Sequence, residues 1–243
     1  MNSTKKDKSI LGVDVNSIIK QTFVDQAKQA AASGDDLVFE AFVHEPKQFK
    51  QVSEYLSEKA KAAHIELYKG YIESFNKASA ELDTADRSSA NSRHSDFRSL
   101  KLDEAYNLNG TWLHELYFAN CFDPHSEIVM DSAAFLRLQR DFGTFEDWQR
   151  DFIACGLSAG NGWVVTGFNM FLKKYVNTIV SHHSGDIHMG LYPVIVVDMW
   201  EHTYFRDYLT DKKSYLIAQM KEFNWTVIEE RFKKAEAIAQ VLK

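Results

Sequence analysis

The sequence predicts an α+β protein in which a helical first half is followed by a second half that combines helices with a small sheet. Apolar and aromatic residues recur at helical spacing through long stretches of the first half, as they do on the buried face of a helix. Three short runs of β-branched and aromatic residues occur in the second half, where Gly, Asn and Pro bound them as they bound strands. Because these helical and strand patterns are segregated along the chain, they indicate the α+β class.

Residues 10–32 are expected to form the first helix, because they place six apolar residues near one helix face. These residues are Ile18, Ile19, Phe23, Ala27, Ala30 and Ala31. The tract SGDD at 33–36 ends this helix. Residues 37–49 are predicted to be extended and irregular, since Pro46 stops a helix from continuing.

A long helix is expected to begin near Ser57, which is a residue type that caps helix N-termini, and to run to residue 82. Residues 83–96 are rich in Ser and Asp without any periodicity and indicate an exposed linker. A further helix covers roughly residues 101–123, and the boundary between the two halves lies near residues 124–131.

The second half begins with two helices and ends with three, and its strands lie between them. The helices are expected at 132–143, 145–157, 202–209, 214–223 and 225–242, and the strands at 161–169, 174–183 and 191–198. We therefore divide the chain into an N-terminal extension with one helix, a helical-hairpin domain and a C-terminal α+β domain. Their bounds are 1–50, 51–130 and 131–243.

The composition excludes several classes of protein. The chain has 243 residues, of which 45% are apolar, so it can bury the core of one large domain or two small ones. A net charge of −6 without a long basic run argues against a protein whose main role is to neutralise nucleic-acid phosphates. No uninterrupted apolar stretch reaches the roughly 18 residues of a membrane-spanning helix. We expect neither a nucleic-acid nor a membrane partner.

The two cysteines, Cys121 and Cys155, are too few for a disulfide framework and are expected to be small buried apolar residues. The basic start of the chain is followed by an apolar run that is too short for a signal peptide and is interrupted by Asp14. We therefore expect the protein in the cytoplasm or in another non-secreted, reducing compartment.

Two of the nine histidines lie within aromatic helix faces. The first face, at spacings i, i+4, i+7 and i+11, is formed by His64, Tyr68, Tyr71 and Phe75. The second is formed by His114, Tyr117, Phe118 and Cys121. Each face on its own is more typical of ordinary core than of a ligand site, but a buried histidine needs a polar partner. Two such helices that face each other would bring two imidazoles together.

The stretch DMWEH at 198–202 supplies what those imidazoles lack. Asp198 ends an apolar strand, and His202 follows four residues later at the start of a helix. Three imidazoles and one carboxylate form a set of nitrogen and oxygen donors that suits iron, manganese or zinc. Trp200, Tyr117 and Trp163 would line such a site. The simpler interpretation is a helix N-terminus at which Asp198 is a cap and His202 is incidental.

With these residues in place, the chain resembles the iron/manganese superoxide dismutase family from about residue 50 to 227. DMWEHTYFRDY matches the family's D-x-W-E-H-x-Y signature, while AAHIELYKGYIESFN and GTWLHELYF resemble its two ligand helices. FGTFEDWQRDF, GNGWVV and EFNW match the FGSF, GSGW and VNW landmarks in the same order. The resemblance implies the family's fold, in which a long helical hairpin precedes an α/β domain with a three-stranded antiparallel sheet.

The resemblance also implies a mononuclear metal site and the roles of its neighbours. The expected ligands are His64, His114, Asp198 and His202, with a solvent molecule as the fifth ligand of iron or manganese, of which iron is favoured. Tyr71 corresponds to the tyrosine that gates the substrate funnel, and Trp163 and Trp200 to its hydrophobic wall. Glu201 corresponds to the residue that reaches a partner subunit's His202, which implies a homodimer or higher oligomer. Lys212 falls at the funnel mouth.

Several positions depart from the family pattern. Tyr68 replaces a histidine near the gate and Phe205 replaces the tyrosine that bonds it, and losing both partners of a hydrogen bond costs less than losing one. Gly110 stands where the iron lineage has a glutamine. His183 aligns with the glutamine of the manganese lineage, and we expect it to hydrogen-bond the bound solvent and so to tune the metal.

The implied activity is that of an antioxidant enzyme that converts superoxide to oxygen and hydrogen peroxide, while the metal alternates between its +3 and +2 states. Two alternatives stay open. The first is a structural subunit of a larger assembly, which the extension at 1–50 and the altered gate pair motivate and whose partner would bind through that extension. The second is a zinc hydrolase with Glu201 as general base. His182 and His188 are expected in an exposed loop and not in a separate zinc site.

Overall fold

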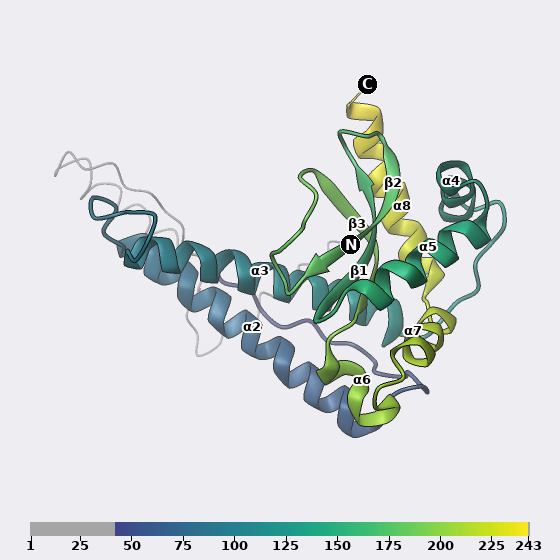
Figure 1. The fold of residues 1–243 in the computed structure, drawn as a ribbon, viewed down its shortest axis with the longest axis horizontal. Helices are drawn as coiled ribbons and strands as arrows, with labels where there is room; N and C mark the ends of the chain where they lie inside the picture. The colour runs from purple at the N-terminus through teal and green to yellow at the C-terminus, as the bar shows by residue number, and fades with distance from the viewer. Residues whose placement is uncertain (1–41, 243) are drawn as a thin grey trace, which may run out of the picture. The chain divides into compact units, whose positions relative to one another are not determined.

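The computed structural model describes residues 42–242, and its two longest elements are the helices α2 (Glu58–Thr84) and α3 (Asp96–Cys121). The two helices lie side by side along most of their length (Figure 1). The side chains of Ser57 and Ser95 cap them by accepting hydrogen bonds from the backbone N–H groups of Ala60 and Arg98. The prediction of Ser57 as an N-cap is confirmed, whereas α3 begins at Asp96 and not near residue 101, because Ser95 supplies a cap inside the expected linker.

The buried residues of α2 recur at helical spacing, so one face of this helix packs and the other meets solvent. α3 behaves differently along its length. Its first half is mostly exposed or half-buried, whereas from Gly110 onward nearly every residue is buried. The second half of α3 therefore passes through the core, and it carries His114 into the interior.

Three strands form an antiparallel sheet, as expected, and the structure gives their order as β2-β1-β3. They are β1 (Gly162–Asn169), β2 (Lys174–Ser181) and β3 (Leu191–Asp198). β1 is central and buried along its whole length. The register places Trp163 of β1 opposite Asp198, which is the last residue of β3. The sheet thus fixes Trp163, an expected wall residue of the candidate site, next to Asp198, an expected ligand.

Five further helices complete the described fold, and each lies where the sequence predicted a helix. They are α4 (Ala133–Phe142), α5 (Phe145–Ser158), α6 (Glu201–Tyr208), α7 (Lys212–Lys221) and α8 (Trp225–Val241). α5 packs against β1 and β2, while α3 and α8 pack against β3 (Figure 1). None of the helices within residues 42–242 is long and apolar enough to cross a membrane.

A buried polar junction joins the hairpin to the sheet. The Asn120 side chain of α3 donates to the Val196 carbonyl of β3 at 3.0 Å. The Arg231 guanidinium of α8 donates to the Asn120 side chain, to the Leu116 carbonyl at 3.0 Å and to the Val194 carbonyl at 3.2 Å. Burial lowers the pKa of Arg231 to about 10, and these acceptors hold the guanidinium in place. Because the junction spans α3 and β3, it sets how far His114 lies from the end of β3.

Some predictions fall on residues that the structure does not describe. The helix expected at 10–32 lies outside residues 42–242, and so does part of the irregular stretch at 37–49. Residues 42–49 contain neither helix nor strand, as expected, and residues 85–95 connect α2 to α3 through turns and bends. The division of the chain at 50/51 and 130/131 stays a prediction.

Candidate metal centre

Four side chains from distant parts of the chain converge at one point: His64, His114, Asp198 and His202. One ligand atom from each lies within 4.8 Å of the others. His64 belongs to α2, His114 to the buried half of α3, Asp198 to the end of β3 and His202 to the first turn of α6. Among the described residues no second group of three or more such side chains meets in this way, so His182 and His188 form no separate cluster.

Asp198 is at the centre of the group. Its Oδ2 lies 3.1 Å from His64 Nε2, 3.4 Å from His202 Nε2 and 3.8 Å from His114 Nε2. Its other oxygen accepts the Trp200 backbone N–H at 2.8 Å, and its carbonyl accepts the Tyr215 hydroxyl at 2.7 Å. One carboxylate oxygen is thereby fixed by the backbone while the other faces the three imidazoles.

The first turn of α6 carries His202 towards this carboxylate. The Asp207 side chain of α6 accepts the Ser57 backbone N–H at 2.8 Å, and the Tyr208 hydroxyl donates to the Tyr55 carbonyl at 2.9 Å. These bonds hold α6 against the start of α2, which carries His64. The spacing of four residues that the sequence showed between Asp198 and His202 thus becomes a strand end and a helix turn that face the same point.

Burial and charge set the protonation states of the cluster. Burial opposes ionisation of Asp198, but the adjacent His202 and His64 outweigh it and hold the pKa of this carboxyl well below its usual range. Burial lowers the pKa of His64, although Asp198 opposes the shift. Burial lowers the pKa of His114 further, and His64 adds to that effect. The buried part of the group is therefore an ionised carboxylate with two neutral imidazoles, which is the state in which both residue types bind metals.

The environment of His114 fits a metal ion. Its Nδ1 donates to the Gly110 carbonyl at 2.6 Å, so the lone pair lies on Nε2. That Nε2 is buried and has no hydrogen-bond partner among the described residues. An unpaired buried nitrogen is costly, and it is satisfied if it binds a cation in the cluster. Together with the nitrogen and oxygen donors, this orientation fits iron, manganese or zinc.

A chain of hydrogen bonds runs behind the cluster from Trp163 through His183 to Tyr71. The Trp163 Nε1 donates to His183 Nδ1 at 3.0 Å, and His183 Nε2 lies 2.8 Å from the Tyr71 hydroxyl. Because an indole N–H only donates, Nδ1 is unprotonated and the Nε2–H of His183 donates to Tyr71. Burial lowers the pKa of His183 to about 4, so the ring is neutral near pH 7. A bond from His183 to metal-bound solvent stays a prediction, and it would have to replace one of these two.

The packing of Tyr71 explains why residue 110 is a glycine. A Cβ at this position would lie 2.9 Å from Tyr71 Cδ1, so the glycine makes room for the aromatic ring beside α3. Sequence reasoning interpreted Gly110 only as the loss of a glutamine. Tyr106 was missed altogether: its ring lies 4.7 Å from that of His183 and 6.2 Å from that of Tyr71. The signal was present, because Tyr106, Gly110 and His114 recur every four residues on one face of α3.

Aromatic rings enclose the cluster as the sequence predicted. The Trp163 ring lies 4.8 Å from that of His114, and the Tyr117 ring lies 5.5 Å from that of His64. Trp200 stacks on His202 with ring centroids 5.7 Å apart. Trp163 and Tyr117 are fully buried, so this side of the site excludes bulk water.

The remaining predicted residues lie at the edge of the site. Glu201 is exposed in the first turn of α6, and Phe205 is 50% exposed. The Lys212 ammonium donates to the Gly160 carbonyl at 2.6 Å; burial lowers the pKa of Lys212, while Asp198 and Glu201 act in the opposite direction. Tyr68 is buried and donates to Glu115 at 2.9 Å.

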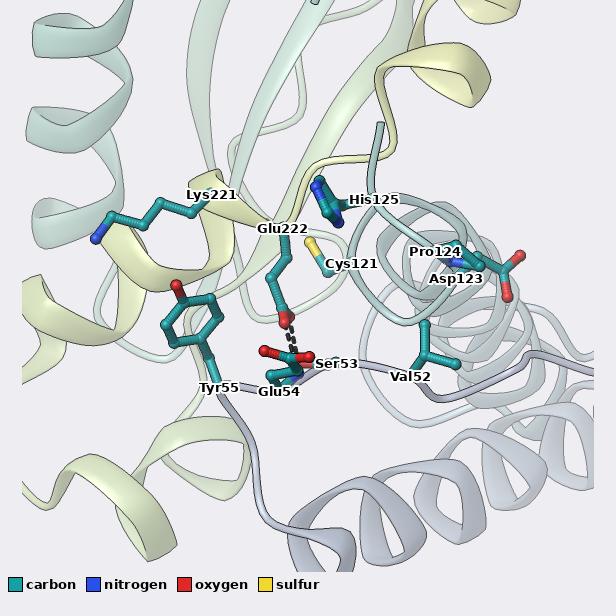
Figure 2. A pocket seen from close by; sticks show the side chains of 10 residues that line it. All are labelled: Val52, Ser53, Glu54, Tyr55, Cys121, Asp123, Pro124, His125, Lys221 and Glu222. Carbon is teal, nitrogen blue, oxygen red and sulfur yellow. Dashed lines mark hydrogen bonds between the residues drawn. The ribbon is translucent and has the colours of Figure 1, made fainter. Parts of the chain in front are cut away.

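A separate hollow of about 310 Å³ lies where residues 52–55, 121–125 and 221–222 meet (Figure 2). None of the four clustered side chains lines it. Its buried carboxylate, Glu222, is already bonded to the Ser53 hydroxyl and to the Glu54 backbone N–H. The hollow therefore does not compete with the cluster as the candidate site.

Comparisons with known proteins identify relatives of this chain. The family model described as "Iron/manganese superoxide dismutases, C-terminal domain" matches residues 131–231. The chain is 34% identical to the iron superoxide dismutase of Aquifex pyrophilus over 179 residues, which are 72% of this chain and 83% of that protein. It is 34% identical to the iron enzyme of Cupriavidus metallidurans over 74% of this chain and 90% of that protein. A manganese superoxide dismutase of Haloferax volcanii is 26% identical over 78% of this chain and 94% of that protein.

Proposed function

The chain belongs to the iron/manganese superoxide dismutase family, and we propose that it converts superoxide to oxygen and hydrogen peroxide at one iron or manganese ion held by the four clustered side chains. The observation that carries this proposal is the convergence of His64, His114, Asp198 and His202 within 4.8 Å. These side chains come from two long helices, a strand end and the first turn of a further helix. Unrelated surface residues of the same types would not converge in this way. Iron is favoured over manganese.

When bound, the metal ion supplies or accepts the electron in each half-reaction by alternating between its +3 and +2 states. The carboxylate of Asp198 and the imidazoles of His64, His114 and His202 would hold the ion, and hydrogen bonds of the chain fix the direction of their donor atoms. Bonds such as that from His114 Nδ1 to the Gly110 carbonyl keep the lone pair pointed into the cluster.

The reduction of superoxide to hydrogen peroxide consumes protons, and Tyr71 and His183 are in position to move them. Since His183 Nε2–H donates to the Tyr71 oxygen, the Tyr71 hydroxyl proton stays free to be donated elsewhere. Burial raises the pKa of Tyr71, and the neighbouring Tyr106 and Asp198 raise it further, so Tyr71 remains protonated at neutral pH. The half-buried Tyr106, whose ring lies 6.2 Å from that of Tyr71, would return the proton from water.

Superoxide is an anion, whereas the chain carries a net charge of −6. A local cation is therefore needed to draw the substrate to the site. Lys212 is the candidate, since its charge interacts with both Asp198 and Glu201.

We propose that the functional unit is a homodimer. The side chain of His202 is 30% exposed although it belongs to the ligand group, and the adjacent Glu201 and the nearby Phe205 are exposed as well. A second copy that covers α6 would enclose His202, with Glu201 bonded to the partner subunit's His202. Both cysteines within the described residues are free, which supports a non-secreted, reducing compartment.

The test couples metal analysis by mass spectrometry to a direct assay of superoxide decay on the full-length protein. We expect stoichiometric iron or manganese and rapid decay in the wild type, and neither in His202→Ala. His94→Ala, which removes an exposed histidine outside the cluster, is the control and should behave as wild type. Full activity in metal-free His202→Ala protein would refute the proposal. Bound metal without superoxide decay would favour the structural-subunit alternative, and bound zinc with hydrolysis would favour the zinc-hydrolase alternative.

A further inference from the structure

A buried carboxylate sits beside one of the metal ligands and takes no part in the proposed chemistry. Glu115 follows His114 on α3, and its side chain is only 6% exposed. Three groups donate to it. The Tyr68 hydroxyl lies 2.9 Å and the His44 Nε2 lies 2.5 Å from its Oε1, and the Lys47 ammonium bonds its Oε2. A buried acid with this many charged and polar partners is strongly localised.

These three donors come from two different parts of the chain. Tyr68 belongs to α2 and lies one helical turn after the ligand His64. His44 and Lys47 belong to residues 42–55, which precede α2 and which we call the strap. The Lys47 backbone N–H also donates to the Tyr68 hydroxyl at 3.1 Å. Glu115 therefore ties α3 to α2 and both helices to the strap.

The first end of the strap is bonded to the C-terminal half of α2. The Phe42 backbone N–H donates to the Ser79 side chain at 2.7 Å. The Asn76 side chain accepts the His44 N–H at 2.8 Å and donates to the His44 carbonyl at 2.9 Å. The pairing of His44 with Asn76 fixes the backbone from which its imidazole reaches Glu115.

The other end of the strap is bonded at the hollow described above, where Ser53 and Glu54 meet the buried carboxylate of Glu222 (Figure 2). The Val52 N–H donates to the carbonyl of Phe122, the residue after α3, at 2.8 Å. Between the two ends, the Phe49 ring packs 5.2 Å from that of Phe118. Because both ends are held, the strap is a fixed support from which His44 and Lys47 act on Glu115.

The geometry links this support to the metal ligands. His64 and Tyr68 are one turn apart on α2, while His114 and Glu115 are adjacent on α3. A change in the spacing of the two helices would therefore move both imidazoles together with the Tyr68–Glu115 bond. The rings of His64 and His114 lie only 5.0 Å apart, so a small change in helix spacing alters their approach to a common ion.

We propose that Glu115 is a positioning residue of the metal centre, which holds α2 and α3 at the spacing that His64 and His114 need through its bonds to Tyr68, His44 and Lys47. The inference rests on the proposed function only in that the cluster binds iron or manganese. It predicts that the strap, although it contributes no ligand, takes part in metal binding.

The decisive measurements are metal affinity and the spectrum of the bound ferric ion in the full-length protein. Glu115→Gln keeps the shape of the side chain and an acceptor for Tyr68 but loses the negative charge that His44 and Lys47 bind. We expect metal binding to weaken by about ten-fold, measured by competition with a chelator, since groups that support metal ligands typically change affinity by ten- to a hundred-fold. The ferric electron paramagnetic resonance spectrum should change at the same time, because the ligand directions change.

Matched variants separate positioning from general destabilisation. Glu81→Gln removes a carboxylate of α2 that is half exposed and paired with Lys77, and it should leave affinity and spectrum unchanged. His44→Ala and Lys47→Met remove the strap's donors without touching either ligand helix, and each should reproduce part of the Glu115→Gln effect. Tyr68→Phe combined with Glu115→Gln should weaken binding by less than the product of the two single effects, because the two residues share one bond.

Wild-type affinity and an unchanged spectrum in Glu115→Gln would overturn the proposal. If Glu115→Gln fails to fold, wild-type values in both His44→Ala and Lys47→Met would overturn it as well. A wild-type protein that binds metal but does not consume superoxide contradicts the proposed function alone, whereas a wild-type protein that binds neither iron nor manganese contradicts both.

Discussion

His64, His114 and Asp198 are almost wholly enclosed by their own chain, whereas the side chain of His202 is 30% exposed and Glu201 and Phe205 of the same helix are exposed as well. On the enclosed side, hydrogen bonds support the candidate ligands. The Gly110 carbonyl accepts a hydrogen bond from His114, and the strap bonds Glu115 beside it. The opposite side of the site, around His202 on α6, is more open to solvent, and we call it the open side. The contrast shows that one chain encloses three of the four candidate ligands, and it is the basis of the homodimer proposed above.

The largest expected effect comes from breaking the enclosed side at its centre. Asp198→Ala removes the oxygen that faces all three imidazoles. We expect retained metal to fall below about a tenth of the wild-type content, because the site loses its one carboxylate and with it the negative charge that favours a cation. Mass spectrometry of the purified protein measures this. Wild-type metal content in Asp198→Ala would mean that the four side chains do not form the site.

The open side is tested through the assembly. Glu201→Ala should weaken the dimer by about 1.5 to 3 kcal/mol for each hydrogen bond between His202 and the charged carboxylate that is lost. Metal content should stay near the wild-type value in concentrated protein. Sedimentation equilibrium of wild type and variant gives the dissociation constants. An unchanged dimer, or a wild-type protein that is monomeric, would remove the reason for assigning Glu201 to the interface.

The enclosed side should also respond to acid, because it holds the His183 ring neutral. Burial lowers the pKa of His183 to about 4, while the unfolded chain has the ordinary value of about 6.5. Between these values the unfolded state binds more protons, so stability falls as the pH decreases from about 6.5 to about 4, by up to about 3 kcal/mol. Urea unfolding of the metal-free protein at several pH values should show a shallower loss in His183→Gln. Identical pH profiles would contradict the assignment.

The fit between Gly110 and Tyr71 offers a finer test of the same side. Gly110→Ala places a Cβ 2.9 Å from the Tyr71 ring and should destabilise the fold by about 1 to 3 kcal/mol, as overpacking usually does. Activity should fall while metal content remains, since Tyr71 shifts away from His183. Gly70→Ala is the matched control on α2: nothing lies within 4 Å of its added Cβ, so stability should rise by about 0.5 to 1 kcal/mol. Equal effects of the two substitutions would contradict this account.

The smallest effect is expected at the mouth of the site. Lys212→Gln should slow superoxide consumption by about two- to five-fold at low ionic strength, with the difference shrinking as salt screens the charge. Metal content and stability should change little, because the contacts of the ammonium are one hydrogen bond to the Gly160 carbonyl and a cation–π contact at 5.9 Å with the Tyr204 ring. Rate constants measured across a salt series test this. A difference that is independent of salt would point to a packing role.

Much of the fold and of the ligand set could be predicted from local patterns in the sequence. The spacing of His64 and Tyr68 predicted a helix face, and the step from Asp198 to His202 predicted a strand end followed by a helix turn. These features could be predicted because each depends on residues within a few turns or one strand of one another. The start of α3 was missed for the opposite reason, since the Ser95 cap lies in a stretch that composition alone marks as a linker.

What the sequence by itself determined is which residue types the chain places on each helix face and strand end, and through them the family and the donor set. Only the tertiary structure decided that both ring nitrogens of His183 bond Trp163 and Tyr71, that Gly110 makes room for Tyr71, and that Glu115 is buried against the strap. Each of these depends on which distant segments meet and at what spacing. Helix packing and sheet register set that spacing, and no local stretch of sequence encodes it.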